Sequence, residues 1–429
     1  MKEPQLTRLL SWRQGTAMAI GSVIGCGILV LPAITVQQAG PASIVSWLIM
    51  ALLSFPMVIT LSRLAVLIPQ AGGIAAYVQQ AFGSRISAIT GWLLLGTIPI
   101  GVPSIALTGA LYLYYFTPLA SIETISIAAL MLTLSLYLNI RGIEISGQTS
   151  VIIISTIIII LLTTIAAALP HVDLAAFQPF NPYGWVEVGK TTLLVFFSFV
   201  GWEMIVPLAE EFKQPARDIP ISLSIAALFI AVLYIAISFT TIGTYTDTTL
   251  NNSASLSSMM ALGFGKSAGM LTAILAVLIA FACIHANIAG FSRLIYAQAR
   301  EGYFPSFLAQ LHPVYRTPIR ALQGLGLAFT IVLLVYFFYQ PSLGEILKYP
   351  SASFLASYII MMVSALTILN KEDIGWWSAL LSLIACIVIY PFSGFAALFP
   401  IALVGSGWLI TKNMPQETET NRKVDRNSN

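Results

Sequence analysis

Long runs of apolar residues, separated by short polar stretches, make up most of this chain. The run 151–162, for example, contains only two polar side chains, Ser155 and Thr156. A helix needs about 20 such residues to cross the hydrocarbon core of a bilayer, because each residue adds about 1.5 Å. Runs of this kind predict spans at 14–37, 43–68, 87–116, 120–140, 147–169, 189–209, 219–243, 268–298, 319–339, 344–369, 374–391 and 393–411. The pattern therefore predicts an all-α polytopic membrane protein with about 12 transmembrane helices.

The basic residues test this count, since Lys and Arg gather in cytoplasmic loops. With the N-terminus inside, seventeen basic residues fall on the inner side and three, Lys190, Lys266 and Lys348, on the outer side. A missed or added helix would scramble this alternation. We therefore expect both termini to be cytoplasmic, and we expect the short basic segment 1–13 to lead into an uncleaved first span.

Composition narrows the class of protein further. Only 20 Lys and Arg and 17 Asp and Glu occur among 429 residues, whereas soluble domains carry about a quarter charged residues. This excludes a water-soluble globule, and the lipid bilayer must be the main solvent. The basic residues near the C-terminus alternate with acidic ones, so no nucleic-acid partner is expected. The cysteines, Cys26, Cys283 and Cys386, lie far apart in apolar runs and predict no disulfide framework, metal site or cofactor.

The first span contains a glycine-rich interruption. Gly21, Gly25 and Gly27 fall within seven residues, and each costs a helix about 1 kcal/mol relative to Ala. Close helix packing through a small-xxx-small pair is one explanation. A break in the helix is the other.

The sixth span favours the break, because it is disturbed at the matching place. The segment 197–203, Phe-Ser-Phe-Val-Gly-Trp-Glu, lies near its middle, with Pro207 a turn later. Spans one and six open two blocks of five, and an odd number gives the blocks inverted topology. Paired interruptions at matching positions in two halves point to the binding site of a transporter. Free amides at one break and free carbonyls at the other would suit the zwitterionic head of an amino acid.

Glu203 is the one acidic residue near the middle of a span. A carboxylate there costs about 2.5–3.5 kcal/mol on insertion scales, so it is protonated much of the time or paired. It either braces the broken helix through hydrogen bonds or couples transport to protons. His285 and Asn287, in the eighth span, are weaker candidates, because a lone intramembrane His is as often a helix-to-helix hydrogen-bonding residue as a proton relay.

These motifs together resemble the amino acid, polyamine and organocation transporter superfamily over nearly the full chain. The first-span motif is 21–28, Gly-Ser-Val-Ile-Gly-Cys-Gly-Ile, followed by Pro32, and the sixth-span motif is 199–203, Phe-Val-Gly-Trp-Glu. Cytoplasmic stretches at 69–83, 211–220 and 299–305 agree in order and spacing. The residues at 82–85, at 91–93 and after Glu203 most resemble those of a bacterial branch that exports methionine and branched-chain amino acids.

The resemblance implies a five-plus-five inverted-repeat fold with discontinuous helices 1 and 6 and two additional C-terminal helices. The expected divisions are 1–13, 14–169, 189–369, 374–411 and a cytoplasmic tail at 412–429. It also implies that the substrate meets the two breaks, at Val23, Gly25, Cys26, Gly27 and Ile28 and at Phe197, Phe199, Val200 and Gly201. Proton coupling or gating would fall to Glu203 and Phe197. Cys26 stands where relatives usually have Ser, and Phe197 where they often have a gating Trp.

Further pocket candidates are Ser22, Ile98, Gly101, His285 and Asn287. This lining is small and apolar, which favours a neutral aliphatic or thioether side chain. We expect alternating-access, proton-coupled efflux of methionine, leucine, isoleucine and valine across a bacterial inner membrane, by a monomer or homodimer. An importer or exchanger of the same fold is the alternative within transporters. An intramembrane enzyme is disfavoured, because no HExxH motif, paired intramembrane Asp or Ser-His arrangement occurs.

Overall fold

The computed structural model describes residues 10–25, 27–69, 73–142, 147–244, 254–300 and 304–411, without the side chains of residues 147–151, 204, 207 and 210. Across these ranges the regular elements are α-helices and short 3-10 helices, and the one extended pairing is an isolated bridge between Leu10 and Phe212. The all-α prediction is confirmed.

The first half of the chain forms α1 (Trp12–Val23), α2 (Gly27–Ala39), α3 (Ser43–Leu67), α4 (Gly73–Phe82), α5 (Ser84–Gly96), α6 (Ile98–Tyr112), α7 (Ser121–Ile140) and α8 (Gly147–Ala168). The second half forms α9 (Trp185–Ser198), η5 (Trp202–Met204), η6 (Val206–Glu211), α10 (Pro215–Gly243), α12 (Ser255–Phe264), α13 (Lys266–Arg300), α14 (Ile319–Tyr339), α15 (Leu343–Ile368), α16 (Ile374–Ile389), η8 (Tyr390–Ala397) and α17 (Leu398–Ile410).

These helices account for the predicted spans. Nine stretches of described helix are long and apolar enough to cross a membrane. Three of them, Gly27–Leu67, Ser84–Tyr115 and Ile374–Ile410, each join two α-helices, and the first and last of these each contain parts of two spans. The first span is the pair α1 and α2, and the sixth is α9 with its 3-10 continuation. The protein is therefore a multi-pass membrane protein of about twelve spans.

Local details differ from the sequence pattern. The third span is divided at Thr97 into α5 and α6. Hydropathy also missed the shorter helices α4 and α12, which are too brief to span a bilayer.

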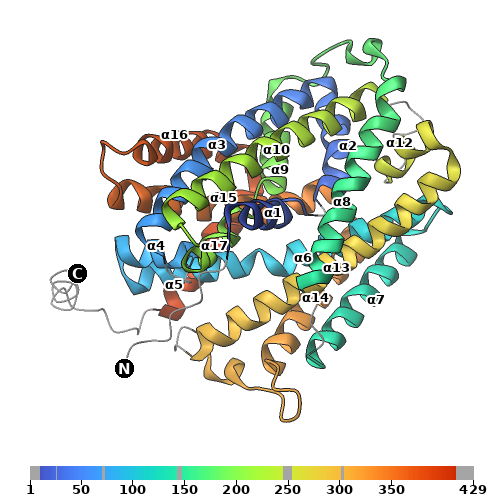
Figure 1. The fold of residues 1–429 in the computed structure, drawn as a ribbon. Helices are drawn as coiled ribbons and strands as arrows, with labels where there is room; N and C mark the ends of the chain where they lie inside the picture. The colour runs from blue at the N-terminus through green and yellow to red at the C-terminus, as the bar shows by residue number, and fades with distance from the viewer. Residues whose placement is uncertain are drawn as a thin grey trace, which may run out of the picture.

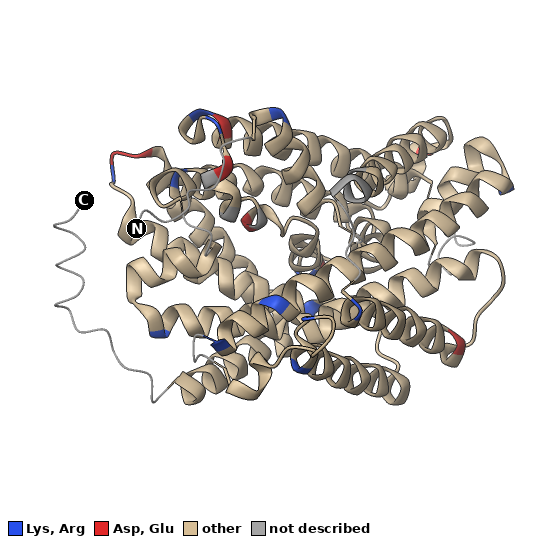
Figure 2. Cartoon of the chain, turned by 60° about the horizontal axis from the view of Figure 1, so that its bottom comes forward, with Lys and Arg blue, Asp and Glu red and all other residues tan. Residues whose placement is uncertain are grey.

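The helices pack into one bundle in which segments far apart in sequence lie side by side (Figure 1). The neighbours include α10 with α3 and α1, and α13 with α6 and α7. Large apolar side chains such as Leu52, Leu327 and Phe338 remain exposed on the outside, where lipid would cover them. Charged residues lie mostly at helix ends and in connections, and long stretches of helix carry none (Figure 2).

One ion pair attaches the additional C-terminal helices to the first block. Arg63 Nε, near the end of α3, lies 3.3 Å from Asp373 Oδ1, and the same carboxylate accepts a hydrogen bond from Gly375 N at 2.7 Å as the cap of α16. The cap satisfies one of the free amides at the start of that helix. Arg63 therefore connects α3 to the start of α16.

Candidate functional site

The first predicted break is present between α1 and α2. Ile24 adopts φ −71° and ψ 83°, and Gly25 N donates to Val23 O at 2.7 Å. This is the geometry of an inverse γ-turn, which ends α1 because the backbone departs from helical dihedrals. Helix α2 then begins at Gly27, so the first turn of α2 presents unpaired backbone amides at mid-span.

The second predicted break lies between α9 and η5, and its geometry depends on Gly201. This residue has φ +125°, which L side chains rarely adopt. A Cβ at this position would lie 2.4 Å from Ser22 O, a backbone atom of the first break. The two breaks therefore touch backbone to backbone, and only glycine allows that approach.

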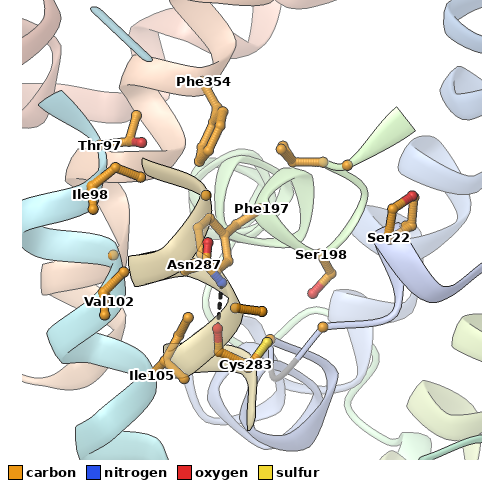
Figure 3. A pocket seen from close by; sticks show the side chains of 18 of the residues that line it. Ser22, Thr97, Ile98, Val102, Ile105, Phe197, Ser198, Cys283, Asn287 and Phe354 are labelled. Carbon is orange, nitrogen blue, oxygen red and sulfur yellow. Dashed lines mark hydrogen bonds between the residues drawn. The ribbon is translucent and has the colours of Figure 1, made fainter. Parts of the chain in front are cut away.

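A cavity of about 480 Å³ lies at the two breaks (Figure 3). We call it the central cavity. Its walls come from α1, α2, the α5–α6 junction, α9, η5, α13 and α15. In Figure 3, Ile98 and Val102 lie on one side, Ser22 and Ser198 on the other, and Phe197 and Asn287 between them. The lining residues are Gly21, Ser22, Val23, Ile24, Gly25, Gly27, Ile28, Thr97, Ile98, Gly101, Val102, Ile105, Phe197, Ser198, Val200, Gly201, Glu203, Cys283, Ala286, Asn287, Gly290, Phe291, Leu294 and Phe354.

Most of the candidates named from sequence meet in this cavity. They are Ser22, Val23, Gly25, Gly27 and Ile28 from the first break, Phe197, Val200, Gly201 and Glu203 from the second, and Ile98, Gly101 and Asn287 from other spans. Cys26 lies outside the described residues. The structure thus brings residues from four separate spans to one place.

Two candidates lie elsewhere. Phe199 is buried with its ring 5.1 Å from that of Tyr234 and 6.5 Å from that of Trp47, so it packs behind the break. His285 faces α7, where Asn139 Nδ2 lies 3.0 Å from its Nδ1. His285 lies two residues from Asn287, about 200° around α13, so the two side chains face opposite ways. Phe199 follows the last residue of α9 and is not among the lining residues of the central cavity.

Glu203 lies at the edge of the central cavity and is held in place by donors. The Tyr358 hydroxyl, on α15, donates to its Oε2 at 2.6 Å, and Gly201 N donates to the same atom at 3.0 Å. Its Oε1 has no hydrogen-bond partner in the described part of the chain. The side chain is 7% exposed. The break matters here, because it frees the Gly201 amide to bind the carboxyl group.

The remaining polar groups of the lining are mostly paired within their own helices. Ser22 Oγ donates to Ala19 O at 2.9 Å, Thr97 Oγ1 to Leu94 O at 2.6 Å, and Asn287 Nδ2 to Cys283 O at 2.8 Å. No Lys or Arg is among the lining residues. The wall is therefore mainly apolar, and Glu203 is the one lining residue that carries a carboxyl group.

The central cavity lies toward one face of the membrane. Helix α13 contributes Cys283, Asn287 and Leu294, which fall in the half of α13 that ends at Arg300. Helix α1, which starts at Trp12, contributes residues near its end. We call the face where α1 begins and α13 ends the N-terminal face, and the opposite one the outer face.

Sequence reasoning missed Cys283 and Phe354 in the lining, as well as Tyr358 behind Glu203. Helical spacing carried part of the signal: Ile98, Gly101, Val102 and Ile105 follow an i, i+3, i+4, i+7 pattern. Phe354 and Tyr358 carried no such signal, because nothing in α15 is interrupted in a way that marks the site.

Comparisons with known proteins agree with this architecture. The model of the amino acid permease family matches residues 10–422. The uncharacterized amino acid permease YecA of Bacillus subtilis is 50% identical over 409 residues, covering 95% of this chain and 96% of the relative. The L-methionine/branched-chain amino acid exporter YjeH of Escherichia coli is 27% identical, covering 94% and 96%. The branched-chain amino acid permease BcaP of B. subtilis is 25% identical, covering 86% and 83%.

The match extends through both breaks, the central cavity and the additional C-terminal helices. This chain belongs to the amino acid permease family, within the amino acid, polyamine and organocation transporter superfamily.

Proposed function

We propose that this protein is a secondary active transporter of neutral amino acids, with methionine, leucine, isoleucine and valine as substrates, and that it exports them in exchange for protons. The observation that supports this proposal most is the central cavity between two backbone breaks. It is closed in by small and apolar side chains and holds no basic one.

The breaks supply groups for a zwitterionic head. The first turn of α2, at Gly27 and Ile28, offers free amides and the positive end of a helix dipole to the substrate carboxylate. Next to the start of α2, α9 ends at Ser198, whose Oγ would lie 3.1 Å from a Cβ at Gly27, and the last carbonyls of a helix favour the ammonium group. Ser198 Oγ has no hydrogen-bond partner among the described residues, so it adds an unused polar atom at this end.

The rest of the lining fits an uncharged side chain. Ile98, Val102, Ile105 and Phe354 form an apolar wall, and no basic group faces it to bind an acidic side chain. Apolar pockets discriminate weakly, at about 1–3 kcal/mol per methylene. One site would therefore carry several aliphatic and thioether side chains.

Glu203 is the proposed proton carrier. It contacts the Gly201 amide within the second break, so a change in its charge acts directly on the backbone that binds substrate. Tyr358 connects the same carboxyl group to α15, a helix that also lines the cavity through Phe354. Protonation at Glu203 would thus bias how the second break packs against α15.

For orientation, we propose that the N-terminal face is cytoplasmic, with both termini inside, in the inner membrane of a bacterium. The distribution of basic residues supports this, with seventeen assigned to that side. The gradients and the coupling set the direction of transport, and the fold does not. Efflux is proposed because the relatives include one named as an exporter.

Counterflow in proteoliposomes tests the proposal. Purified protein is reconstituted with unlabelled leucine inside, and uptake of labelled leucine or methionine is followed with and without an imposed pH gradient. We expect saturable counterflow of both, stimulated by the gradient, with arginine and glutamate ineffective as competitors. Transport of a cationic amino acid but not of leucine would contradict the argument from the apolar cavity. A rate that ignores the pH gradient would contradict proton coupling.

A further inference from the structure

Three exposed arginines lie where α7 ends and α14 begins. Arg141 directly follows α7, Arg316 lies just before α14, and Arg320 is in the first turn of α14. The two helices lie side by side (Figure 1). Helix α13 ends at the N-terminal face and a short connection leads from it to α14, so the arginines are at that face. We call Arg141, Arg316 and Arg320 the arginine cluster.

Hydrogen bonds hold the connection before α14 against the end of α7. Arg141 Nη1 donates to the Tyr315 hydroxyl oxygen at 2.7 Å, and Thr317 Oγ1 donates to the last carbonyl of α7 at 2.8 Å. The connection also closes on itself, because His312 N donates to Thr317 O at 2.7 Å and His312 O accepts from Arg316 N at 3.0 Å. These bonds hold Arg316 at φ +58°, which is uncommon for a residue with a side chain. Arg316 is thereby fixed near the end of α7.

Neighbouring side chains do not neutralise the positive charge of the arginine cluster. The stretches 124–142 and 304–323 contain no Asp or Glu. Within the described ranges, none of the three arginines forms an ion pair. Arg320 instead donates to uncharged amides, at 3.1 Å to Gln310 Oε1 and at 3.2 Å to Gln323 Oε1. Three guanidinium groups without a carboxylate partner favour an anion as ligand.

Exposed apolar side chains continue from the arginine cluster along both helices. Leu327 on α14 is 65% exposed and Leu130 on α7 is 67% exposed, with Ile331 and Leu134 exposed beside them. We call these four residues the apolar stripe. Arg320, Leu327 and Ile331 follow an i, i+7, i+11 spacing, so they share one face of α14. From Arg320 to Ile331 the helix rises about 16 Å, which is about half of the hydrocarbon core of a bilayer. One leaflet of acyl chains covers the same depth.

A phospholipid with a net negative headgroup matches both features. Its phosphate can meet the guanidinium groups, whose planar forks suit phosphate oxygens, while its acyl chains lie on the apolar stripe. Basic sites between transmembrane helices bind anionic headgroups in this way. A zwitterionic headgroup brings a cation of its own, which the arginine cluster repels. A free phosphate ion has no part that would contact the apolar stripe.

We propose that the arginine cluster and the apolar stripe bind one anionic phospholipid from the leaflet at the N-terminal face. Arg141, Arg316 and Arg320 hold its phosphate between the ends of α7 and α14. The site lies on the outside of the bundle, so it depends neither on the identity of the substrate nor on the direction of transport.

Lipid titration of the purified, delipidated full-length protein in detergent is the test, with bound lipids counted by native mass spectrometry. The probes are phosphatidylglycerol, phosphatidylcholine with the same acyl chains, and inorganic phosphate. We expect one phosphatidylglycerol per chain to bind at a concentration about tenfold or more below that needed for phosphatidylcholine. Inorganic phosphate at the same concentration as the lipid should not displace it.

Charge-removing variants identify the residues that bind the lipid. Each of Arg141→Gln, Arg316→Gln and Arg320→Gln should raise the half-saturating concentration of phosphatidylglycerol about fivefold, and the triple variant about 100-fold. The affinity for phosphatidylcholine should stay unchanged. Arg316→Gln keeps the test independent of folding, because the Arg316 side chain forms no hydrogen bond or ion pair with the described residues. Its thermal unfolding in detergent should match that of the wild type.

The matched control is the triple variant Lys213→Gln, Arg217→Gln, Lys371→Gln. It removes the same charge from exposed basic residues assigned to the same face, which have acidic neighbours in the sequence. It should bind phosphatidylglycerol as the wild type does, and a loss as large as that of the arginine variant would reduce the site to a general attraction of the face. Equal binding of both lipids, or unchanged binding in the arginine triple variant, would overturn the site. Displacement of phosphatidylglycerol by inorganic phosphate would assign the cluster to a free anion and overturn the lipid proposal.

Discussion

Replacing Gly201 by alanine should separate the two helix breaks without changing any charge. Gly201 has φ +125°, where an L residue is strained by about 1–3 kcal/mol. The new Cβ would also lie 2.4 Å from Ser22 O and 2.8 Å from Ser22 C, closer than real Cβ atoms come to backbone.

The size of the effect follows from these distances. The Ser22 carbonyl must retreat by about 0.6 Å merely to reach 3.0 Å from the Cβ, and by about 1 Å to reach ordinary contact at 3.4 Å. Neither atom belongs to a flexible side chain, so the first break itself has to shift. Misplacing binding groups by about 1 Å typically costs on the order of 100-fold in rate.

Leucine counterflow into proteoliposomes measures this directly. We expect Gly201→Ala to insert and purify normally and to transport about 100-fold more slowly than the wild type. The matched control is Gly324→Ala in α14, where an added Cβ would meet no atom within 4 Å. It should transport at the wild-type rate, since alanine is the better helix former.

Wild-type counterflow in Gly201→Ala would refute the reasoning. It would show that the close approach of the two breaks at Gly201 and Ser22 is not needed for binding. Equal loss of transport in Gly324→Ala would instead show a general sensitivity of the bundle to added methyl groups.

Three further predictions concern single contacts. Glu203→Gln should remove the dependence of counterflow on pH, measured on both sides of neutrality, because the amide cannot ionise; a retained pH profile would exclude Glu203 as the proton carrier. Tyr358→Phe, which deletes the 2.6 Å hydrogen bond to Glu203, should slow counterflow about tenfold or more, whereas Tyr349→Phe on the exposed side of α15 should not. Asn139→Ala should lower the free energy of unfolding by about 1–3 kcal/mol, measured by thermal denaturation in detergent, because His285 loses one of its hydrogen-bond partners in α7. The half-saturating leucine concentration should stay unchanged, and a large increase would place His285 in the substrate site.

The spans and the two breaks were predictable because both leave marks in the sequence. Each span can be identified by itself, from the length of its apolar run and from the basic residues that flank it. Three glycines in seven residues are unfavourable in a helix, and Gly201 and Glu203 inside an apolar run combine a helix-weakening residue with a carboxyl group that is costly in a membrane. The structure places breaks at both positions.

The environment of Glu203 was not predictable in the same way. Its partner Tyr358 lies 155 positions later in an ordinary apolar span, and only the packing of α15 brings the two together. The directions of Phe199 and His285 could not be read from the sequence either. Phe199 packs against Tyr234 just past the end of α9, and His285 faces α7 because of the rotation of α13 about its axis.

The central claim, that substrate binds in the cavity between the breaks, is tested most directly by chemical protection of Cys283. This cysteine lines the central cavity, whereas Cys386 is fully buried. In a Cys26→Ser background, which removes the remaining thiol, the rate of alkylation of Cys283 by a small thiol reagent is measured with and without leucine. We predict that leucine slows the reaction in proportion to its occupancy, with the half-effect at the concentration that half-saturates counterflow. An alkylation rate unchanged by saturating leucine, in protein that still carries out counterflow, would contradict the account.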